Sequence, residues 1–232
     1  MPKLINRENS KRHLQWLSLC ALIVLFACNA SAQSKEPLPS DDTQMWSEAQ
    51  LILPIRKDIN LTLSGALRIG NDINRLVYER AGASVSFNLG KYFSFVPIYY
   101  YIATQPVAGL NGRENRLSFD GTVRLPVGRF TLSDRNVVEL RFRNSTESTR
   151  YYNRLQLERQ IKFNDVELKL FISDAVYYDW SVNAWSRNRF WVGGGKDLTK
   201  NLSLELYYMK QNDSFSRPGN LHAIGTIFKV RL

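Results

Sequence analysis

Apolar and polar residues alternate with a period of two from residue 59 to the end of the chain. In 59–69 the odd positions carry mainly Ile and Leu, whereas the even positions carry Asn, Thr, Ser, Ala and Arg. Strict alternation places the two sets on opposite faces of a β-strand. The pattern recurs in segments separated by turn residues, and no window shows the 3.6-residue period of an amphipathic helix. An all-β protein is therefore expected.

The segments have the length and spacing of strands in an antiparallel transmembrane up-and-down barrel of about 10–12 strands. Most have the 9–11 residues that a tilted strand needs to cross hydrocarbon, or slightly more. Segment 45–53 is less regular, and it lies either outside the barrel wall or beside a twelfth strand that the pattern does not reveal. Ten strands would leave both ends of the barrel in the periplasm. The ten regular strands are expected at 59–69, 76–89, 93–104, 114–125, 137–145, 151–163, 166–177, 187–195, 202–211 and 221–232.

Short and long connections also alternate along the chain. The links at 89–92, 163–166 and 196–201 are short, and those at 105–113, 178–186 and 212–220 are longer. Outer-membrane barrels show this asymmetry between their periplasmic turns and their extracellular loops. The alternation therefore supports a barrel that crosses the outer membrane.

The charged residues indicate which face of the barrel meets lipid. Charges of both signs occupy alternate positions, opposite apolar residues such as Leu117 and Leu140. A membrane barrel places such a polar face in its lumen, where charges of opposite sign on neighbouring strands can pair. A soluble barrel with a buried apolar face is the alternative. The candidate lumen charge ladder is Arg68, Arg80, Glu114, Arg116, Asp120, Arg124, Glu139, Arg141, Arg143, Arg154, Glu158, Arg187 and Arg189.

Aromatic residues gather where the strands approach the longer links. Amphipathic rings are enriched at membrane–water interfaces, so these residues are expected to form an interfacial belt. The last strand, with Ile224, Phe228 and Leu232 on one face, resembles the signal by which barrel-assembly machinery selects its clients. The aromatic set is Tyr99, Tyr100, Tyr101, Tyr151, Tyr152, Tyr177, Tyr178, Trp180, Trp185, Tyr207 and Tyr208.

The amino-terminal residues have the features of a cleaved signal peptide. A basic start precedes an apolar stretch at 14–27, and Ala30-Ser31-Ala32 supplies a small-x-small cleavage site. The alternative is lipidation of Cys28, which follows a lipobox-like sequence. The expected organisation is a signal peptide at 1–32, a flexible leader at 33–44 and an outer-membrane barrel at 45–232, in the cell outer membrane of a Gram-negative bacterium.

Composition excludes several classes of protein. Both cysteines, Cys20 and Cys28, lie within the expected signal peptide, so the mature chain is not a disulfide-stapled domain. The formal net charge of +10 could suggest a nucleic-acid partner. The basic residues are scattered over alternate strand positions, however, and an exported chain without a basic cluster is not expected to bind nucleic acid.

The chain lacks the residue combinations of outer-membrane enzymes. His222 is the one histidine beyond the expected signal peptide, and Ile224 stands where a deacylase or phospholipase would carry a serine. A strand-end interfacial residue is the favoured interpretation of His222 over a general base. The run 193–196, Gly-Gly-Gly-Lys, lacks the rest of a phosphate-binding loop. Glu114 and Asp120 are interpreted as ladder members, and no enzyme activity, cofactor or metal site is expected.

The order of these features resembles the "domain of unknown function 2490" family, which is thought to consist of outer-membrane barrels. The resemblance rests on Trp46, 114–116 (Glu-Asn-Arg), 139–141 (Glu-Leu-Arg), 154–159, the Arg187/Arg189 pair and the late His222. It covers most of the mature chain. The resemblance implies a barrel fold, and it implies no substrate, cofactor or catalytic residue.

Two functions remain open for such a barrel. The first is a structural or narrow-pore barrel whose lumen is largely closed by its own Arg and Glu side chains. The second is a small, porin-like diffusion channel for anionic solutes such as acidic oligosaccharides, because basic residues exceed acidic ones on the inward face. The expected partners are outer-membrane lipids, the barrel-assembly machinery and, for the channel, anionic solutes.

Overall fold

The structure is a computed structural model, and it describes residues 39–144, 146–164 and 166–232. The expected signal peptide, with its cleavage site and Cys28, lies outside the described residues. Within the described ranges, no helix is long and apolar enough to span a membrane. The strands are β1 (Asp41–Arg56), β2 (Ile59–Gly70), β3 (Arg75–Leu89), β4 (Phe93–Thr104), β5 (Gly112–Val127), β6 (Phe130–Arg143), β7 (Glu147–Phe163), β8 (Val166–Asp179), β9 (Ala184–Asp197), β10 (Leu202–Asp213) and β11 (Asn220–Arg231).

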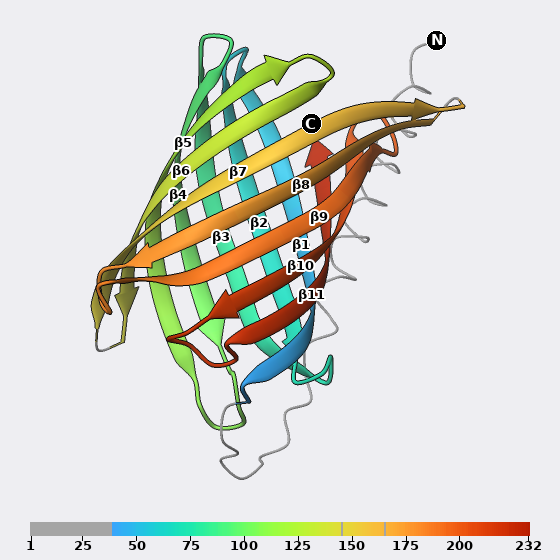
Figure 1. Cartoon of the computed structure of the whole chain (residues 1–232). Helices are drawn as coiled ribbons and strands as arrows, with labels where there is room; N and C mark the ends of the chain where they lie inside the picture. Colours follow the sequence, from blue (N-terminus) through green and yellow to red (C-terminus); the bar gives the residue numbers. More distant parts are fainter. Residues whose placement is uncertain (1–38, 145, 165) are drawn as a thin grey trace, which may run out of the picture. The chain divides into compact units, whose positions relative to one another are not determined.

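These strands close into one barrel in which neighbours in sequence are neighbours in space (Figure 1). Every sequential pair is antiparallel. The barrel is completed by β1 and β11, which pair in parallel, with Trp46 opposite Gly225 and Leu51 opposite Val230. The prediction of an all-β, up-and-down barrel is confirmed.

The segment 45–53 belongs to the wall, and no twelfth strand accompanies it in the part of the chain that the structure describes. Both alternatives suggested by the sequence are therefore wrong. The strand also starts earlier than expected, because 41–44 of the expected leader already pair with β11. An up-and-down barrel with an odd number of strands must close through one parallel pair, and this closure differs from the even number usual in bacterial barrels.

The two ends of the barrel carry different connections. One end, here called the turn end, holds the tight links 57–58, 90–92 and 128–129 together with the carboxyl terminus of β11. The other, the loop end, holds the longer links 105–111 and 214–219. Since β1 is parallel to β11, Asp41 also lies at the loop end. The expectation that both ends of the barrel share one side is thus corrected.

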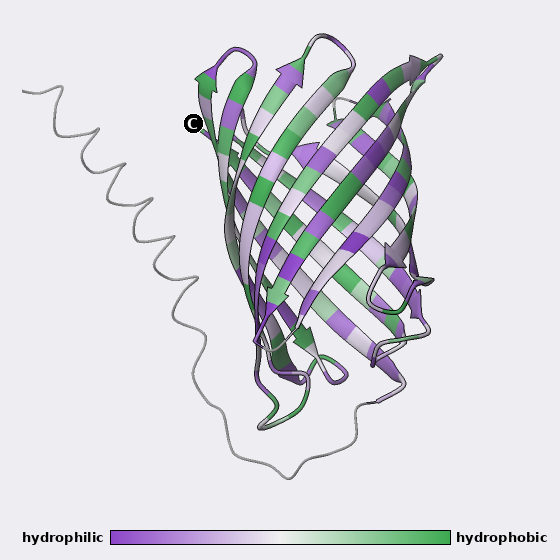
Figure 2. Ribbon diagram, turned by 90° about the vertical axis from the view of Figure 1, so that its left-hand side faces the viewer, coloured by the Kyte–Doolittle hydropathy of each residue, from purple (hydrophilic) through white to green (hydrophobic). Residues whose placement is uncertain are grey.

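Hydrophobic and hydrophilic residues alternate along the strands, as the colouring of Figure 2 shows. Large apolar side chains are exposed on the outside, among them Leu63 (43%), Leu206 (52%) and Ile224 (60%). Charged side chains such as Glu139 (6%) and Arg150 (6%) are buried inside. The molecule therefore has its apolar surface outward and its polar surface inward, the reverse of a soluble barrel.

Candidate functional site: the lumen of the barrel

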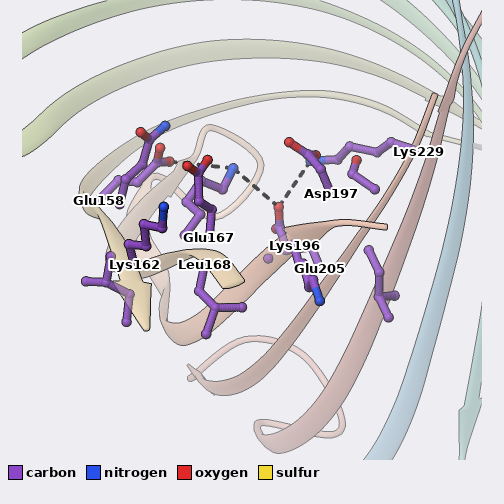
Figure 3. Close-up of a pocket in the computed structure, with 14 residues that line it drawn as sticks. Glu158, Lys162, Glu167, Leu168, Lys196, Asp197, Glu205 and Lys229 are labelled. Carbon is purple, nitrogen blue, oxygen red and sulfur yellow. Dashed lines mark hydrogen bonds and ion pairs between the residues drawn. The ribbon is translucent and has the colours of Figure 1, made fainter. Parts of the chain in front are cut away.

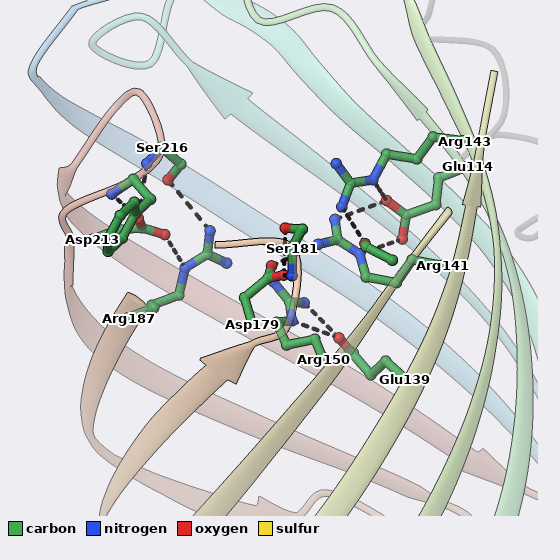
Figure 4. A network of polar contacts seen from close by, with 12 residues as sticks. Glu114, Glu139, Arg141, Arg143, Arg150, Asp179, Ser181, Arg187, Asp213 and Ser216 are labelled. Carbon is green, nitrogen blue, oxygen red and sulfur yellow. Dashed lines mark hydrogen bonds and ion pairs between the residues drawn. The ribbon is translucent and has the colours of Figure 1, made fainter. Parts of the chain in front are cut away.

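Ion pairs between neighbouring strands fill the lumen near the loop end (Figure 4). Glu114 on β5 accepts hydrogen bonds from Arg116 Nε at 2.6 Å and from Arg141 Nη2 at 2.8 Å. Glu139 on β6 accepts from Arg116 Nη1 at 3.1 Å and from Arg150 Nε at 2.7 Å. The two acids therefore share Arg116, and β5, β6 and β7 are joined by one continuous network.

Two further acids hold inward-pointing arginines at strand ends. Asp179, the last residue of β8, lies 3.7 Å from Arg141 Nη1. Asp213, the last residue of β10, pairs with Arg187 and also accepts the backbone amides of Phe215 and Ser216 at 2.8 Å. Asp213 thus fixes the β10–β11 loop over the lumen while it holds an inward-pointing arginine (Figure 4).

Arginines in the middle of the barrel lie against aromatic rings. The Cζ atom of Arg68 is 3.7 Å from the ring centroid of Trp46 and 4.0 Å from that of Tyr78. The Cζ atom of Arg154 is 4.4 Å from the ring of Trp191. Guanidinium groups over aromatic faces are attracted by the ring quadrupole, which offsets part of the cost of burying them.

Two further arginines of the middle region combine a ring with an acid. Arg80 pairs with Glu48 at 2.7 Å and lies 4.3 Å from the ring centroid of Tyr100. Arg135 pairs with Asp120 at 2.6 Å. Their charges are therefore neutralised within the barrel.

Four of the tyrosines expected in an interfacial belt lie inside the barrel instead. Tyr100, Tyr152, Tyr177 and Tyr207 line the lumen, and Tyr177 is only 4% exposed. Their sequence neighbours Tyr99 (49%) and Tyr208 (39%) are exposed on the outside. Adjacent residues on a strand face opposite sides, so each run of tyrosines must divide between the two faces.

Glycines make room for these inward rings. A Cβ atom at Gly225 would overlap the ring of Tyr207, and one at Gly82 would overlap the ring of Tyr100. A Cβ atom at Gly193 would overlap the backbone oxygen of Leu206 and the ring of Phe171. The run 193–196, considered above as a phosphate cradle, thus contains a glycine whose lack of a side chain admits a ring. Close packing, as expected for glycine within a strand, explains Gly193.

The lumen widens at the turn end into a cavity of about 480 Å³ (Figure 3). Lys169 Nζ lies 3.7 Å from Glu158 and 3.9 Å from Glu205, and Lys229 Nζ lies 3.1 Å from Glu205. Charges of both signs alternate here, and the lysines are about one-third exposed. This vestibule is therefore polar and nearly balanced in charge.

All thirteen residues of the candidate ladder point inward, but they do not form one ladder. Glu114, Arg116, Glu139, Arg141 and Arg143 belong to the loop-end network. The others lie apart from that network. Three form separate ion pairs, Arg80 with Glu48, Asp120 with Arg135 and Arg187 with Asp213, while Arg124 bonds Ser94 and Glu158 lines the turn-end cavity. Aromatic rings contact the remaining three, Arg68, Arg154 and Arg189.

Sequence reasoning missed several further charged residues of the lumen, among them Arg135, Arg150, Glu48, Asp179 and Asp213. Arg135 and Arg150 lie just before the strands expected at 137–145 and 151–163, whereas the observed β6 and β7 begin at Phe130 and Glu147. The acids Glu48, Asp179 and Asp213 fall in the irregular first segment or at strand ends. Longer strand boundaries would have placed Arg135, Arg150, Asp179 and Asp213 on the inward face, and Glu48 was missed because the alternation of the first segment is irregular. The three acids in this group lower the excess of positive over negative charge that the sequence suggests for the lumen.

His222 and the acidic side chains are the groups considered above for catalysis and metal binding. His222 is exposed on the outer face, and its Nδ1 atom lies 2.6 Å from the hydroxyl of Tyr208. No group of three or more His, Cys, Asp or Glu side chains that could hold a metal ion occurs within the described ranges. The polar contacts of the lumen are mainly charge pairs between arginines and acids, which position side chains and create an electric field.

Two solved structures of barrel proteins are similar to this chain. Among solved structures it is similar to an anion-selective porin from Comamonas acidovorans, at 16% identity and a TM-score of 0.37, over 77% of this chain and 54% of the porin. It is also similar to the translocator domain of the autotransporter NalP from Neisseria meningitidis, at 14% identity and a TM-score of 0.41, over 69% of this chain and 70% of that domain. The chain thus spans about half the length of the porin.

The comparison with curated proteins gave no match. The model of one protein family, described as "Protein of unknown function (DUF2490)", matches residues 43–221. The match runs from the first strand to the beginning of the last, and it confirms the resemblance inferred from the sequence. This chain is a member of the DUF2490 family.

Proposed function

We propose that the protein is an outer-membrane barrel whose lumen is narrowed by its own side chains to a pore that is nearly closed at rest. The observation that carries this proposal is the inverted distribution of polarity. Buried Arg–Glu pairs occupy the interior, while residues such as Leu206 and Phe228 are exposed on the outside. A barrel of this kind is stable when lipid covers the outer surface.

Aromatic residues on the outer surface support a membrane position. Near the loop end Tyr101, Trp180 and Trp185 are exposed, and near the turn end Tyr92 and Phe130 are exposed. Membrane barrels carry such girdles at both interfaces. In this orientation the loop end faces the exterior and the turn end faces the periplasm, which leaves the outer face of β11 available for recognition by barrel-assembly machinery.

The first prediction concerns location. We expect the mature protein to fractionate with outer membranes, to require detergent for solubility and to migrate faster on a gel before boiling than after it. A compact barrel that resists the detergent of the gel explains the difference in migration. Recovery of the unboiled protein as a soluble periplasmic monomer would contradict the proposal.

The second candidate function is a small diffusion channel for anionic solutes. It is favoured by Arg68, Arg154 and Arg189, because no carboxylate lies within 4 Å of these three guanidinium groups in the described chain. A ring of uncompensated arginine selects anions. The two candidates differ in whether the loop-end network leaves a continuous path for solutes.

Single-channel recording on the refolded protein separates these candidates and supplies the second prediction. Wild-type protein should show small, infrequent, anion-preferring conductance. Replacing Arg141 and Arg143 together with serine removes two of the donors on Glu114 and should raise the conductance, while anion preference falls. The preference should also weaken at high salt, because ions screen fixed charges. A stable cation-selective conductance of the wild-type protein would contradict both candidates.

A further inference from the structure

Most inward arginines of the barrel are matched by an acid, but three in the middle of the lumen are not. Arg68, Arg154 and Arg189 make no ion pair within the described ranges. Their neighbours Arg80 and Arg135 are paired with Glu48 and Asp120. The uncompensated charges are therefore gathered in one region of the lumen rather than spread along it.

Two of these arginines lie against the same aromatic ring, the indole of Trp46. The Cζ atom of Arg68 lies 3.7 Å from the ring centroid of Trp46, and that of Arg189 lies 5.4 Å from it. The indole is itself fixed, because its Nε1 donates to Gln44 Oε1 at 2.7 Å and Gln44 donates to Asp42 at 2.7 Å. Trp46 is 7% exposed. One fixed ring thus contacts two guanidinium groups of like charge.

Neutral acceptors occupy only part of the donor capacity of these guanidinium groups. Arg189 Nε donates to Gln211 at 2.8 Å, and Arg154 donates to Ser173 and Gln156 at 3.0 and 3.1 Å. A guanidinium group carries five N–H donors. Unused donors beside a cavity are therefore available to a ligand.

The third arginine, Arg154, is in register with Arg189. Ala175 lies opposite Arg154 on one side and opposite Arg189 on the other, so the two arginines are two strands apart. That separation corresponds to about 10 Å between backbones. All three arginines line the same cavity of about 280 Å³, which also borders Trp46 and Trp191.

We infer that this cavity binds an oxyanion group, a carboxylate, sulfate or phosphate, between Arg68 and Arg189, with Arg154 as a third donor. An anion that accepts hydrogen bonds of about 2.8 Å from each guanidinium can bridge two groups held against the same indole. Burial of a charge without a counter-ion is unfavourable because the charge loses its hydration, and a bound anion relieves that cost. The inference rests on the proposed function only in that the ligand enters through the lumen.

Cavity size restricts the ligand to a small solute or to one unit of a longer one. A volume of about 280 Å³ is roughly that of nine waters, at about 30 Å³ each in the liquid. Inorganic phosphate or a single sugar acid fits within it. Because the rings are covered by guanidinium groups, recognition depends on the charge of the ligand, and an uncharged sugar should not bind.

The test is a calorimetric titration of the refolded barrel in detergent, and it is the third prediction. Inorganic phosphate and glucuronate are added at constant ionic strength, with glucose as the uncharged control. Wild-type protein should bind both anions and not glucose. The variant carrying Arg68→Gln and Arg189→Gln should bind them about tenfold more weakly or worse, which corresponds to about 1.4 kcal/mol.

The matched control is Arg124→Gln. Arg124 also points inward and has no acid within 4 Å in the described chain, but it bonds Ser94 and lies outside the cavity. Its replacement should change the affinity less than about twofold, or about 0.4 kcal/mol. If the double variant does not fold, Arg68→Lys replaces it, because lysine keeps the charge and loses the forked donors.

Three results would overturn the inference: folded wild-type protein that binds neither anion, equal losses in the Arg124 control, and unchanged affinity in the Arg68 and Arg189 variants. The proposed function fails in a different measurement. A barrel that remains soluble without detergent can still be titrated. A membrane barrel that shows the expected small conductance but binds no anion contradicts the site alone.

Discussion

Replacing Glu139 with glutamine should lower the free energy of unfolding by about 3–5 kcal/mol, because it removes one partner of a buried ion pair. Glu139 is 6% exposed, and its carboxylate accepts hydrogen bonds from Arg116 and Arg150. Arg150 is equally buried, and it would be left with an amide in place of a charge. Urea unfolding of the refolded barrel, followed by tryptophan fluorescence, measures the loss.

A double-mutant cycle shows whether the pair acts as a unit. Arg150→Met alone should cost a similar amount, since it leaves Glu139 with Arg116 as its one remaining partner at hydrogen-bonding distance. The two changes together should cost less than their sum, by about 0.5–3 kcal/mol. Lys169→Gln is the control, because that lysine is 35% exposed and 3.7 Å from Glu158. Such exposed pairs contribute about 0–1 kcal/mol. Losses below about 0.5 kcal/mol for both Glu139→Gln and Arg150→Met would contradict a structural role for the network.

The faces of the strands could be predicted from the sequence because alternation is a local property. In β5 the run from Glu114 to Arg124 carries a polar residue at every even position, and each of these side chains points inward in the structure. No long-range information is needed to assign these faces, since successive residues on a strand must face opposite sides.

Strand boundaries were harder to predict where the outer face is itself polar. Asp134 and Asn136 of β6 and Asn153 of β7 lie on the outer surface and bond one another, with Asn153 Nδ2 donating to Asn136 Oδ1 at 3.1 Å. These polar residues interrupt the alternation, so the strand was expected to begin at Val137. Arg135, which lies between them and points inward, was missed for this reason.

The parallel strand pair that closes the barrel could not be predicted. A strand's own pattern specifies its faces, whereas its partner and direction depend on residues far away in the sequence. Met45 pairs with Ile224 across nearly the whole chain, and the parallel direction follows only from the odd number of strands. The pairing of Arg68 with Trp46 depends on the same register, because Trp46 lies opposite Arg68 on β2. The mid-lumen arginine cluster was therefore invisible in the sequence even though each of its members was identified.

Replacing Leu63 with arginine should reduce membrane insertion far more than replacing its neighbour Ser64 with arginine. The two residues are adjacent on β2, so they lie at nearly the same depth and differ mainly in the face they occupy. Leu63 is 43% exposed on the outer surface, and an arginine near mid-membrane costs about 2–4 kcal/mol. Ser64 lies opposite Gln50 and Gly82 on the inner face, where the new charge meets water and polar side chains.

Refolding into lipid vesicles, scored by the fraction that migrates as the compact form before boiling, compares the two variants. The Leu63 variant should give little compact form, and the Ser64 variant should remain close to the wild-type protein. Leu67→Ser, a polar but uncharged change on the outer face of the same strand, should fall between them, because a hydroxyl costs less in lipid than a charge. Equal yields of the Leu63 and Ser64 variants would mean that the outer face does not meet lipid, and the proposed membrane position would then be wrong.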